Sequence, residues 1–176
     1  MGTQGIPQSR KVWTSVIKQI TKIHPNTIAG GSYRRGAETC KDLDLMLVTP
    51  DGNLPDEVIQ KIGKLGYTFV EQGKKKATAI SNKGYQVDLY ATDEMHSGST
   101  LLHITGSKEF NIGMRAAVAK KAMTFSENGL LNRTTKELIA SRTEDEIFKA
   151  IGYEFIPPEE RVDYFKATKG HKLTDK

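Results

Sequence analysis

The sequence predicts an α+β fold, in which a mixed sheet with helices on one face is followed by a smaller, mostly helical region. Before residue 97, short apolar runs bounded by turn residues alternate with segments whose apolar residues recur every three or four positions. After residue 98, helical spacing predominates. A chain of 176 residues fits one domain with a small appended region, which excludes a large multidomain enzyme.

Helices and strands are expected to alternate along residues 1–97. Apolar residues recur at helical spacing within residues 9–23, and Pro25 ends that helix. Another helix is expected over residues 54–65, where proline and acidic residues stand at its start. Strands are expected over residues 27–29, 43–48, 67–70, 77–81 and 85–90. The turn sequence Asn82-Lys83-Gly84 predicts that the last two strands form an antiparallel hairpin.

Residues 98–165 are expected to form the smaller subdomain. A helix over residues 108–121 places apolar side chains on one stripe. Gly113 in that helix costs about 1 kcal/mol relative to alanine, which favours a close approach by a ligand. A capping box that starts at Thr143 predicts a further helix, ending before Gly152. Residues 166–176 contain several lysines and are expected to form a flexible basic tail.

The charge balance favours a partner that carries phosphates. Lys and Arg number 26 against 21 Asp and Glu, which gives a net charge of +5 and a pI near 9.2. The cluster Lys74-Lys75-Lys76 is a candidate DNA contact, although a solvated surface explains it equally well. The single cysteine, Cys40, excludes an internal disulfide, and no run of about 18 apolar residues predicts a membrane span. We expect an intracellular protein with no membrane partner.

Three aspartates are the candidate catalytic residues and metal ligands. Asp42 and Asp44 alternate with leucines in an expected strand, so both carboxylates point to one face while the leucines enter the core. Two neighbouring anions repel each other unless they share a cation, and a hard divalent metal is the natural solution. Asp88 interrupts an apolar run in another strand and is the candidate third ligand. Alone, each of these features is more often an ordinary surface feature.

A glycine turn precedes the paired aspartates. Residues 30–36 read GGSYRRG and connect one expected strand to the next. Backbone N–H groups at Gly31 and Ser32, the Ser32 hydroxyl and the Arg35 guanidinium are candidate ligands of a triphosphate whose oxygens also reach the metal. The combination predicts a nucleotidyl transfer site. The alternative is a glycine turn followed by arginines that face solvent.

Four segments follow one another along the chain: GGSYRRGAETCKDLD, which carries the glycine turn and the paired aspartates, YQVDLY around Asp88, HITGSKEFNIGMR, and GYEFIPPEER. In this order they resemble motifs of the family X DNA polymerases, of which DNA polymerase beta is the best known. The first segment resembles the family's nucleotidyltransferase signature. The similarity covers most of residues 27–161.

The resemblance implies a nucleotidyltransferase palm over residues 1–97 and a nucleotide-selecting subdomain over residues 98–165. The implied activity is DNA-directed DNA polymerase activity, with Mg²⁺ as two bound ions that Mn²⁺ can replace. The implied partners are primer-template or gapped DNA and a deoxynucleoside triphosphate, bound by a monomer. Before Gly30 there is room for only one helix, so we expect no counterpart of the family's lyase and helix-hairpin-helix modules. We therefore expect gap-filling or repair-type, distributive synthesis without lyase activity.

The resemblance also implies roles for individual residues. Gly106 and Asn111 are expected to contact the incoming nucleotide, and Arg115 the template strand. Lys41 stands where the family often has glycine, and is expected to offer a positive charge to the nucleotide instead. His103 stands in the place of an expected aromatic residue, which leaves the sugar preference open. Lys108 departs from the small or acidic residue common at its position and is expected to reach a DNA phosphate.

Two other functions remain open from the sequence. A template-independent nucleotidyltransferase, acting on a DNA end, an RNA or a small molecule, would share the glycine turn and the carboxylates. Only residues 103–115 argue against it. The other alternative is a nucleic-acid-binding protein with an inactive catalytic site, which the three intact aspartates disfavour.

Overall fold

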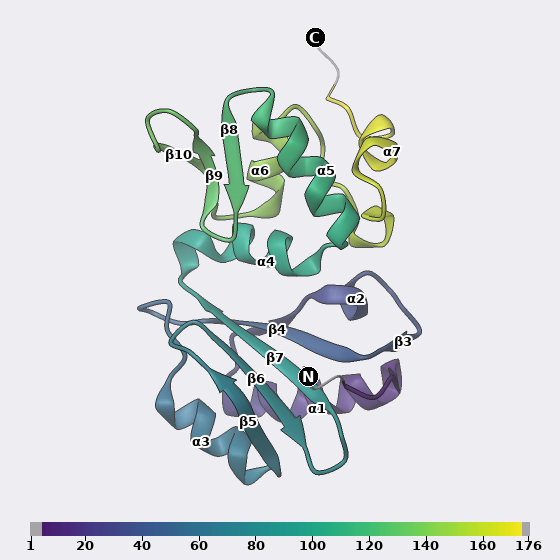
Figure 1. Cartoon of the computed structure of the whole chain (residues 1–176), viewed down its shortest axis with the longest axis vertical. Coiled ribbons are helices and arrows are strands. Elements are labelled where there is room, and N and C mark those ends of the chain that lie inside the picture. Colours follow the sequence, from purple (N-terminus) through teal and green to yellow (C-terminus); the bar gives the residue numbers. More distant parts are fainter. Residues whose placement is uncertain (1–4, 174–176) are drawn as a thin grey trace. The chain divides into compact units, whose positions relative to one another are not determined.

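A computed structural model of the chain describes residues 5–173, which are drawn in colour in Figure 1. The chain divides into two compact units, Met1–Glu94 and Met95–Lys176, and each unit has a hydrophobic core of its own. Among the described residues, no helix is long and apolar enough to cross a membrane.

The first unit is built on a mixed sheet of five strands. Its order is β2 (Thr27–Ala29), β4 (Asp42–Val48), β7 (Gln86–Thr92), β6 (Lys76–Ser81) and β5 (Tyr67–Gln72). Strands β4 and β7 run parallel, and every other neighbouring pair is antiparallel. The expected strands and the β6–β7 hairpin are therefore confirmed, with ends that differ by one or two residues.

Two helices, α1 (Arg10–Ile23) and α3 (Asp56–Lys64), cover one face of this sheet (Figure 1). The apolar side of α1 is fixed against the core partly by Trp13, which is fully buried and donates its indole N–H to the Cys40 carbonyl oxygen at 3.0 Å. Short elements complete the unit: β1 (Gln8–Ser9), α2 (Gly31–Arg34) and β3 (Thr39–Cys40). Because both long helices pack on one face, the opposite face of the sheet is available for polar side chains.

The second unit combines helices with a small antiparallel sheet. The short helix η1 (Glu94–His96) crosses the boundary between the units. The helices that follow in the second unit are α4 (Ser97–Thr105), α5 (Lys108–Ala119), α6 (Glu144–Ala150), η2 (Pro158–Glu160) and α7 (Tyr164–Lys169). The sheet has the order β10 (Leu138–Ala140), β9 (Gly129–Asn132) and β8 (Met123–Ser126). The sequence does not predict this sheet, because strands of three or four residues are too short to show alternation.

The structure corrects the expectations for Gly113 on α5 and for the segment from residue 166, which forms part of α7. A Cβ added at Gly113 would lie 2.6 Å from the Cβ of Tyr164, so this glycine allows close helix packing and needs no ligand to explain it. The expected basic tail from residue 166 is also different in the structure. Ala167 and Thr168 are buried within α7, which gives this segment an apolar side that packs on the core. Residues 174–176 of that expected tail lie outside the described residues.

Candidate active site

Asp42, Asp44 and Asp88 lie together on the face of the sheet opposite α1 and α3. One carboxylate oxygen from each residue lies within 4.8 Å of the others. Asp88 is 8% exposed, and the other two carboxylates are partly buried. The structure thus brings together all three residues that the sequence identifies as candidate metal ligands.

Strand register explains this cluster. In the parallel pair of β4 and β7, Asp44 stands directly opposite Asp88, and Asp42 stands opposite Gln86. Leu43 and Leu45 alternate with the aspartates and are fully buried on the helix-covered face. The alternation was visible in the sequence, but the parallel pairing that sets Asp88 beside Asp44 depends on the tertiary fold.

Burial and neighbouring carboxylates raise the pKa values of Asp42 and Asp44. Burial is the largest cause that raises the pKa of Asp44 to about 7; the charges of Asp42 and Asp88 add to it, and the Tyr90 hydrogen bond and the Arg35 charge partly oppose it. Burial, followed by the charge of Asp88, also raises the pKa of Asp42, whereas Lys41 lowers it. The ionised cluster is therefore unfavourable until a cation compensates for it.

This donor set fits a divalent metal ion. Hard cations such as Mg²⁺ prefer carboxylate oxygens, and three such groups converge here from two adjacent strands. A bound cation would also offset the burial and the repulsion that together raise the pKa of Asp44. Both the chemistry and the electrostatics of these residues therefore fit divalent metal binding.

The glycine turn lies directly against this cluster. Gly30 donates its N–H to the Asp44 carbonyl oxygen at 2.8 Å. Gly31 has a φ of +60°, and a Cβ added to it would collide with the Asp44 carboxylate. Glycine is therefore required here on both conformational and steric grounds. The expected turn is a short helix, α2, whose first N–H groups have no partner within the helix.

Three polar residues that the sequence interpretation missed hold the aspartates in place. Thr78 donates to Asp88 Oδ1 at 2.6 Å in a buried contact, and Gln86 donates to Asp88 Oδ2 at 3.4 Å. The Tyr90 hydroxyl donates to Asp44 Oδ1 at 3.4 Å. Residues 86, 88 and 90 share a face by strand alternation, so that periodicity was an available signal for two of them. Thr78 required knowledge that β6 lies beside β7.

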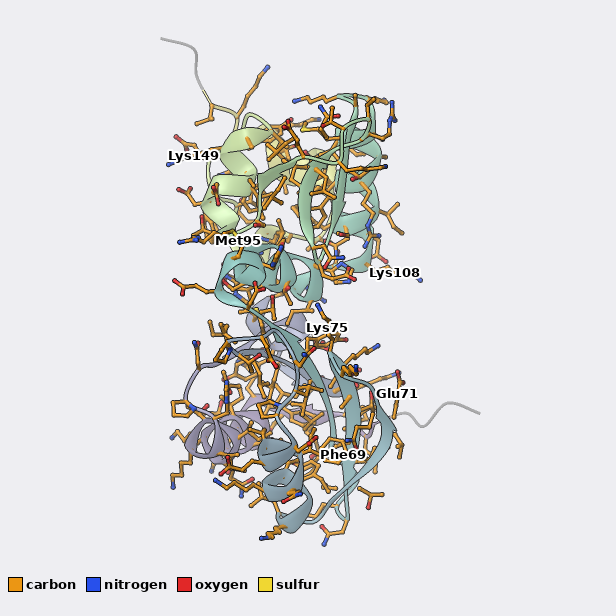
Figure 2. The ribbon with its side chains drawn as sticks, turned by 90° about the vertical axis from the view of Figure 1, so that its left-hand side faces the viewer. Phe69, Glu71, Lys75, Met95, Lys108 and Lys149 are labelled. Atoms are coloured by element: carbon orange, nitrogen blue, oxygen red, sulfur yellow. The ribbon has the colours of Figure 1, made fainter. Side chains whose placement is uncertain are left out.

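The other residues of the first unit that are expected to contact the nucleotide or DNA are more exposed than Asp88. Ser32 and Arg35 are partly buried, whereas Lys41 and the cluster Lys74-Lys75-Lys76 are exposed. Figure 2 labels Lys75, which lies in the turn between β5 and β6. Lys76 begins β6 and lies over the Tyr90 ring, with its Nζ 5.5 Å from the ring centroid. The structure thereby relates one lysine of this cluster to the face that carries the aspartates.

Within the second unit, the structure brings three of the expected selecting residues together. Asn111 is 6% exposed and donates from Nδ2 to the His103 carbonyl oxygen at 2.8 Å, and its Oδ1 has no partner among the described residues. Arg115 lies 3.3 Å from His103 Nδ1, and His103 Nε2 lies 3.8 Å from a Glu127 carboxylate oxygen. His103 therefore links the two α5 residues to the β8–β9 turn.

The remaining two expected residues in this unit lie at or just before the start of α5. Gly106 is buried with a φ of +66°, and its peptide bond to Ser107 is cis. Lys108 is exposed at the first position of α5, as Figure 2 shows. Asn111, by contrast, is buried within α5, whereas Arg115 is exposed.

Family models match both units. The DNA polymerase beta palm model matches residues 6–84, and the DNA polymerase beta thumb model matches residues 100–162. Asp88 lies between these two ranges, so its assignment to the cluster comes from its register with Asp44.

Curated relatives agree with these models. The repair DNA polymerase X of African swine fever virus (strain Badajoz 1971 Vero-adapted) is 29% identical over 152 residues, which cover 84% of this chain and 86% of the relative. The DNA polymerase/3'-5' exonuclease PolX of Bacillus subtilis is 34% identical over 135 residues, which cover 74% of this chain and 23% of the relative. DNA polymerase lambda of Rattus norvegicus is 28% identical over 162 residues, 76% of this chain and 28% of the relative.

A mixed sheet that carries an aspartate cluster beside a glycine turn defines a nucleotidyltransferase catalytic domain. The two family models match residues 6–84 and 100–162 in the order palm, then thumb. The chain belongs to family X of the DNA polymerases, which are DNA-directed DNA polymerases.

Proposed function

We propose that this chain is a gap-filling, repair-type polymerase that adds deoxynucleotides to a primer 3′-hydroxyl group. The observation that carries the proposal is the convergence of Asp42, Asp44 and Asp88 beside Gly31. A relative named as a repair enzyme supports it: the repair DNA polymerase X of African swine fever virus, which this chain matches over 86% of the relative's length.

In the proposed reaction, the primer 3′-oxygen attacks the α-phosphorus of the nucleotide, and pyrophosphate leaves. The Asp88 carboxylate accepts the hydroxyl proton, while Thr78 and Gln86 hold its two oxygens in place. The N–H groups of Gly31 and Ser32 bind triphosphate oxygens together with the Ser32 hydroxyl. Arg35 neutralises the leaving pyrophosphate, and Lys41 adds charge nearby.

Asp42 and Asp44 are the residues that would hold both metal ions, and Asp88 would share one of them. Two Mg²⁺ ions, for which Mn²⁺ can substitute, would lower the pKa of the primer hydroxyl and stabilise the charge that develops on the pyrophosphate. Asp42 and Asp44 are therefore proposed to serve nucleotide binding as well as chemistry.

We propose that residues of the second unit contact the newly formed base pair. Asn111 is proposed to contact the minor-groove edge of the incoming base, and Arg115 the template strand, with Gly106 near the sugar. Minor-groove acceptors occur in every base pair, so such contacts test pair shape rather than sequence. The hydrogen bond and close contact that join Asn111 and Arg115 to His103 support a shared role. Lys108 is proposed to reach a DNA phosphate.

Primer extension on gapped, nicked and single-stranded DNA tests this function. Wild-type protein is expected to fill the gap in preference to extending the other substrates, in the presence of Mg²⁺. Asp42→Ala is expected to lower the rate of nucleotide insertion by at least about a thousandfold, because its carboxylate would hold both metal ions that stabilise the transition state. Asp56→Ala, at an exposed position on α3, is the matched control and is expected to retain activity. If the Asp42 variant keeps a tenth of wild-type turnover, the metal assignment is wrong.

A template-independent nucleotidyltransferase is the second candidate, because the aspartate cluster and the glycine turn serve both reactions. Equal extension of single strands and gapped duplex would favour it. Distributive synthesis, the absence of lyase activity, a monomeric state and an intracellular location stay predictions. Product lengths with excess DNA, a lyase assay on abasic DNA and sedimentation would test the first three.

A further inference from the structure

Helix α1 holds most of the excess positive charge of the chain. It contains four basic residues, Arg10, Lys11, Lys18 and Lys22, and no acidic residue. The whole chain has a net charge of +5. Arg10 is occupied within the fold, since it donates to the Tyr33 and Ala37 carbonyl oxygens at 2.7 and 3.0 Å. The three lysines are exposed and give α1 a positively charged surface.

These lysines form one stripe along the solvent side of α1. Lys11, Lys18 and Lys22 are separated by seven and four residues, so the helical repeat aligns them on one face. The buried residues Trp13 and Ile20 occupy the opposite face. From Lys11 to Lys22 the helix rises about 16 Å, a length over which duplex DNA carries about nine charges.

Helices α3 and α6 balance their lysines differently, with carboxylates on the same helix. On α3, Lys61 pairs with Glu57 at 2.8 Å, and on α6, Lys149 pairs with Asp145 at 2.9 Å. These pairs follow the usual spacing that balances charge on an exposed helix. No such partner exists on α1, because the helix has no carboxylate. Its lysines therefore repel one another until an anion is bound.

A polar recess adjoins this stripe. It has a volume of about 360 Å³ and lies between α1, the end of α3 and the β6–β7 turn. Lys11, Ser15 and Gln19 line it from α1, and Asn82 and Lys83 line it from the turn. Two lysines with nearby hydroxyl and amide groups suit a phosphate oxygen, since both can donate hydrogen bonds to it.

We propose that the Lys11–Lys18–Lys22 stripe and its adjoining recess form a second DNA-binding surface, which holds the phosphate backbone of duplex DNA. It lies on the helix-covered side of the palm sheet, whereas the aspartates lie on the opposite side. The surface therefore contacts a segment of duplex away from the primer terminus and contributes grip rather than chemistry. The choice of duplex DNA as the ligand rests on the proposed polymerase function.

The test compares two triple variants with the same change in net charge. Lys11→Gln/Lys18→Gln/Lys22→Gln removes the stripe, and glutamine has about the same helix propensity as lysine. Lys120→Gln/Lys136→Gln/Lys149→Gln removes three exposed lysines of the second unit as the control. Circular dichroism checks that both variants are folded. Equilibrium binding to a gapped duplex is then measured without nucleotide between about 50 and 200 mM salt.

For the stripe variant, the slope of the logarithm of the DNA-binding constant against the logarithm of the salt concentration is expected to be less steep by about 2 to 3. Each lost phosphate contact lowers this slope by about 0.9. Its affinity is expected to fall at least about tenfold at low salt, and the control is expected to change both values by much less. Single-turnover insertion at saturating DNA should stay within about twofold of wild type, since the aspartates are untouched.

Equal losses in the two triple variants would overturn the proposal, because they would indicate a general effect of net charge. Unchanged affinity in the stripe variant would overturn it as well. Failure of the polymerase function is a separate outcome, in which the wild-type protein inserts no nucleotide while the binding comparison remains measurable.

Discussion

Replacing Asp44 with asparagine is expected to stabilise the metal-free protein while removing its activity. Burial, with the charges of Asp42 and Asp88, raises the pKa of Asp44 to about 7 in the folded protein, whereas an unfolded chain ionises this residue near pH 3.9. Because the folded pKa is the higher one, the folded state binds the proton more tightly. Asp44 therefore contributes stability at low pH that is lost as the pH rises from about 4 to 7.

The magnitude follows from this difference. About three pKa units at about 1.4 kcal/mol each set an upper limit near 4 kcal/mol at pH 8. Solvent reaches this partly exposed carboxylate and relaxation of its neighbours lowers the cost, so we expect a gain of about 1 to 3 kcal/mol from Asp44→Asn. The amide oxygen of asparagine can still accept the Tyr90 hydrogen bond, which keeps the local packing.

Urea denaturation at pH 5 and pH 8 with a chelator measures this gain. The variant should exceed wild type in unfolding free energy at pH 8 and approach it at pH 5. Added Mg²⁺ should stabilise wild type at pH 8 and have little effect on the variant. Asp56→Asn, at an exposed site, is the control for loss of one carboxylate. A variant that is less stable than wild type at pH 8 without metal would refute this electrostatic reasoning.

Four further outcomes are expected. Thr78→Val should lower kcat about tenfold or more with little change in nucleotide KM, because it frees Asp88, and Thr78→Ser should restore it; equal rates for wild type and the valine variant would contradict this. Gly113→Ala should lower the free energy of unfolding by about 1 to 3 kcal/mol in thermal denaturation, because the added methyl group would collide with Tyr164; a more stable variant would contradict this. Arg115→Ala should slow correct insertion opposite a template by about ten- to a thousandfold in single-turnover kinetics, and normal templated insertion would argue against its role. Neutralising Lys74-Lys75-Lys76 should make DNA affinity less sensitive to salt, and an unchanged slope would show that these lysines do not contact DNA.

Local patterns in the sequence were sufficient to predict much of this protein. Alternation in β4 predicted that Asp42 and Asp44 share a face, because side chains of a strand alternate whatever lies beside it. The capping sequence at Thr143 predicted the start of α6, and its hydroxyl does accept from the Glu146 N–H. Ordered motifs also indicated the polymerase family, which the palm and thumb matches confirm.

Relations between distant segments were decided by the tertiary structure. The sequence offered Asp88 as a third ligand, but only the parallel register of β4 and β7 sets it opposite Asp44. The contact of Thr78 with Asp88 likewise depends on β6 pairing with β7. The need for glycine at position 113 could not be predicted from the sequence either, because it arises from the close approach of Tyr164 on α7. Side-chain direction follows from the local backbone repeat, whereas strand neighbours and helix contacts follow from how the whole chain buries its apolar surface.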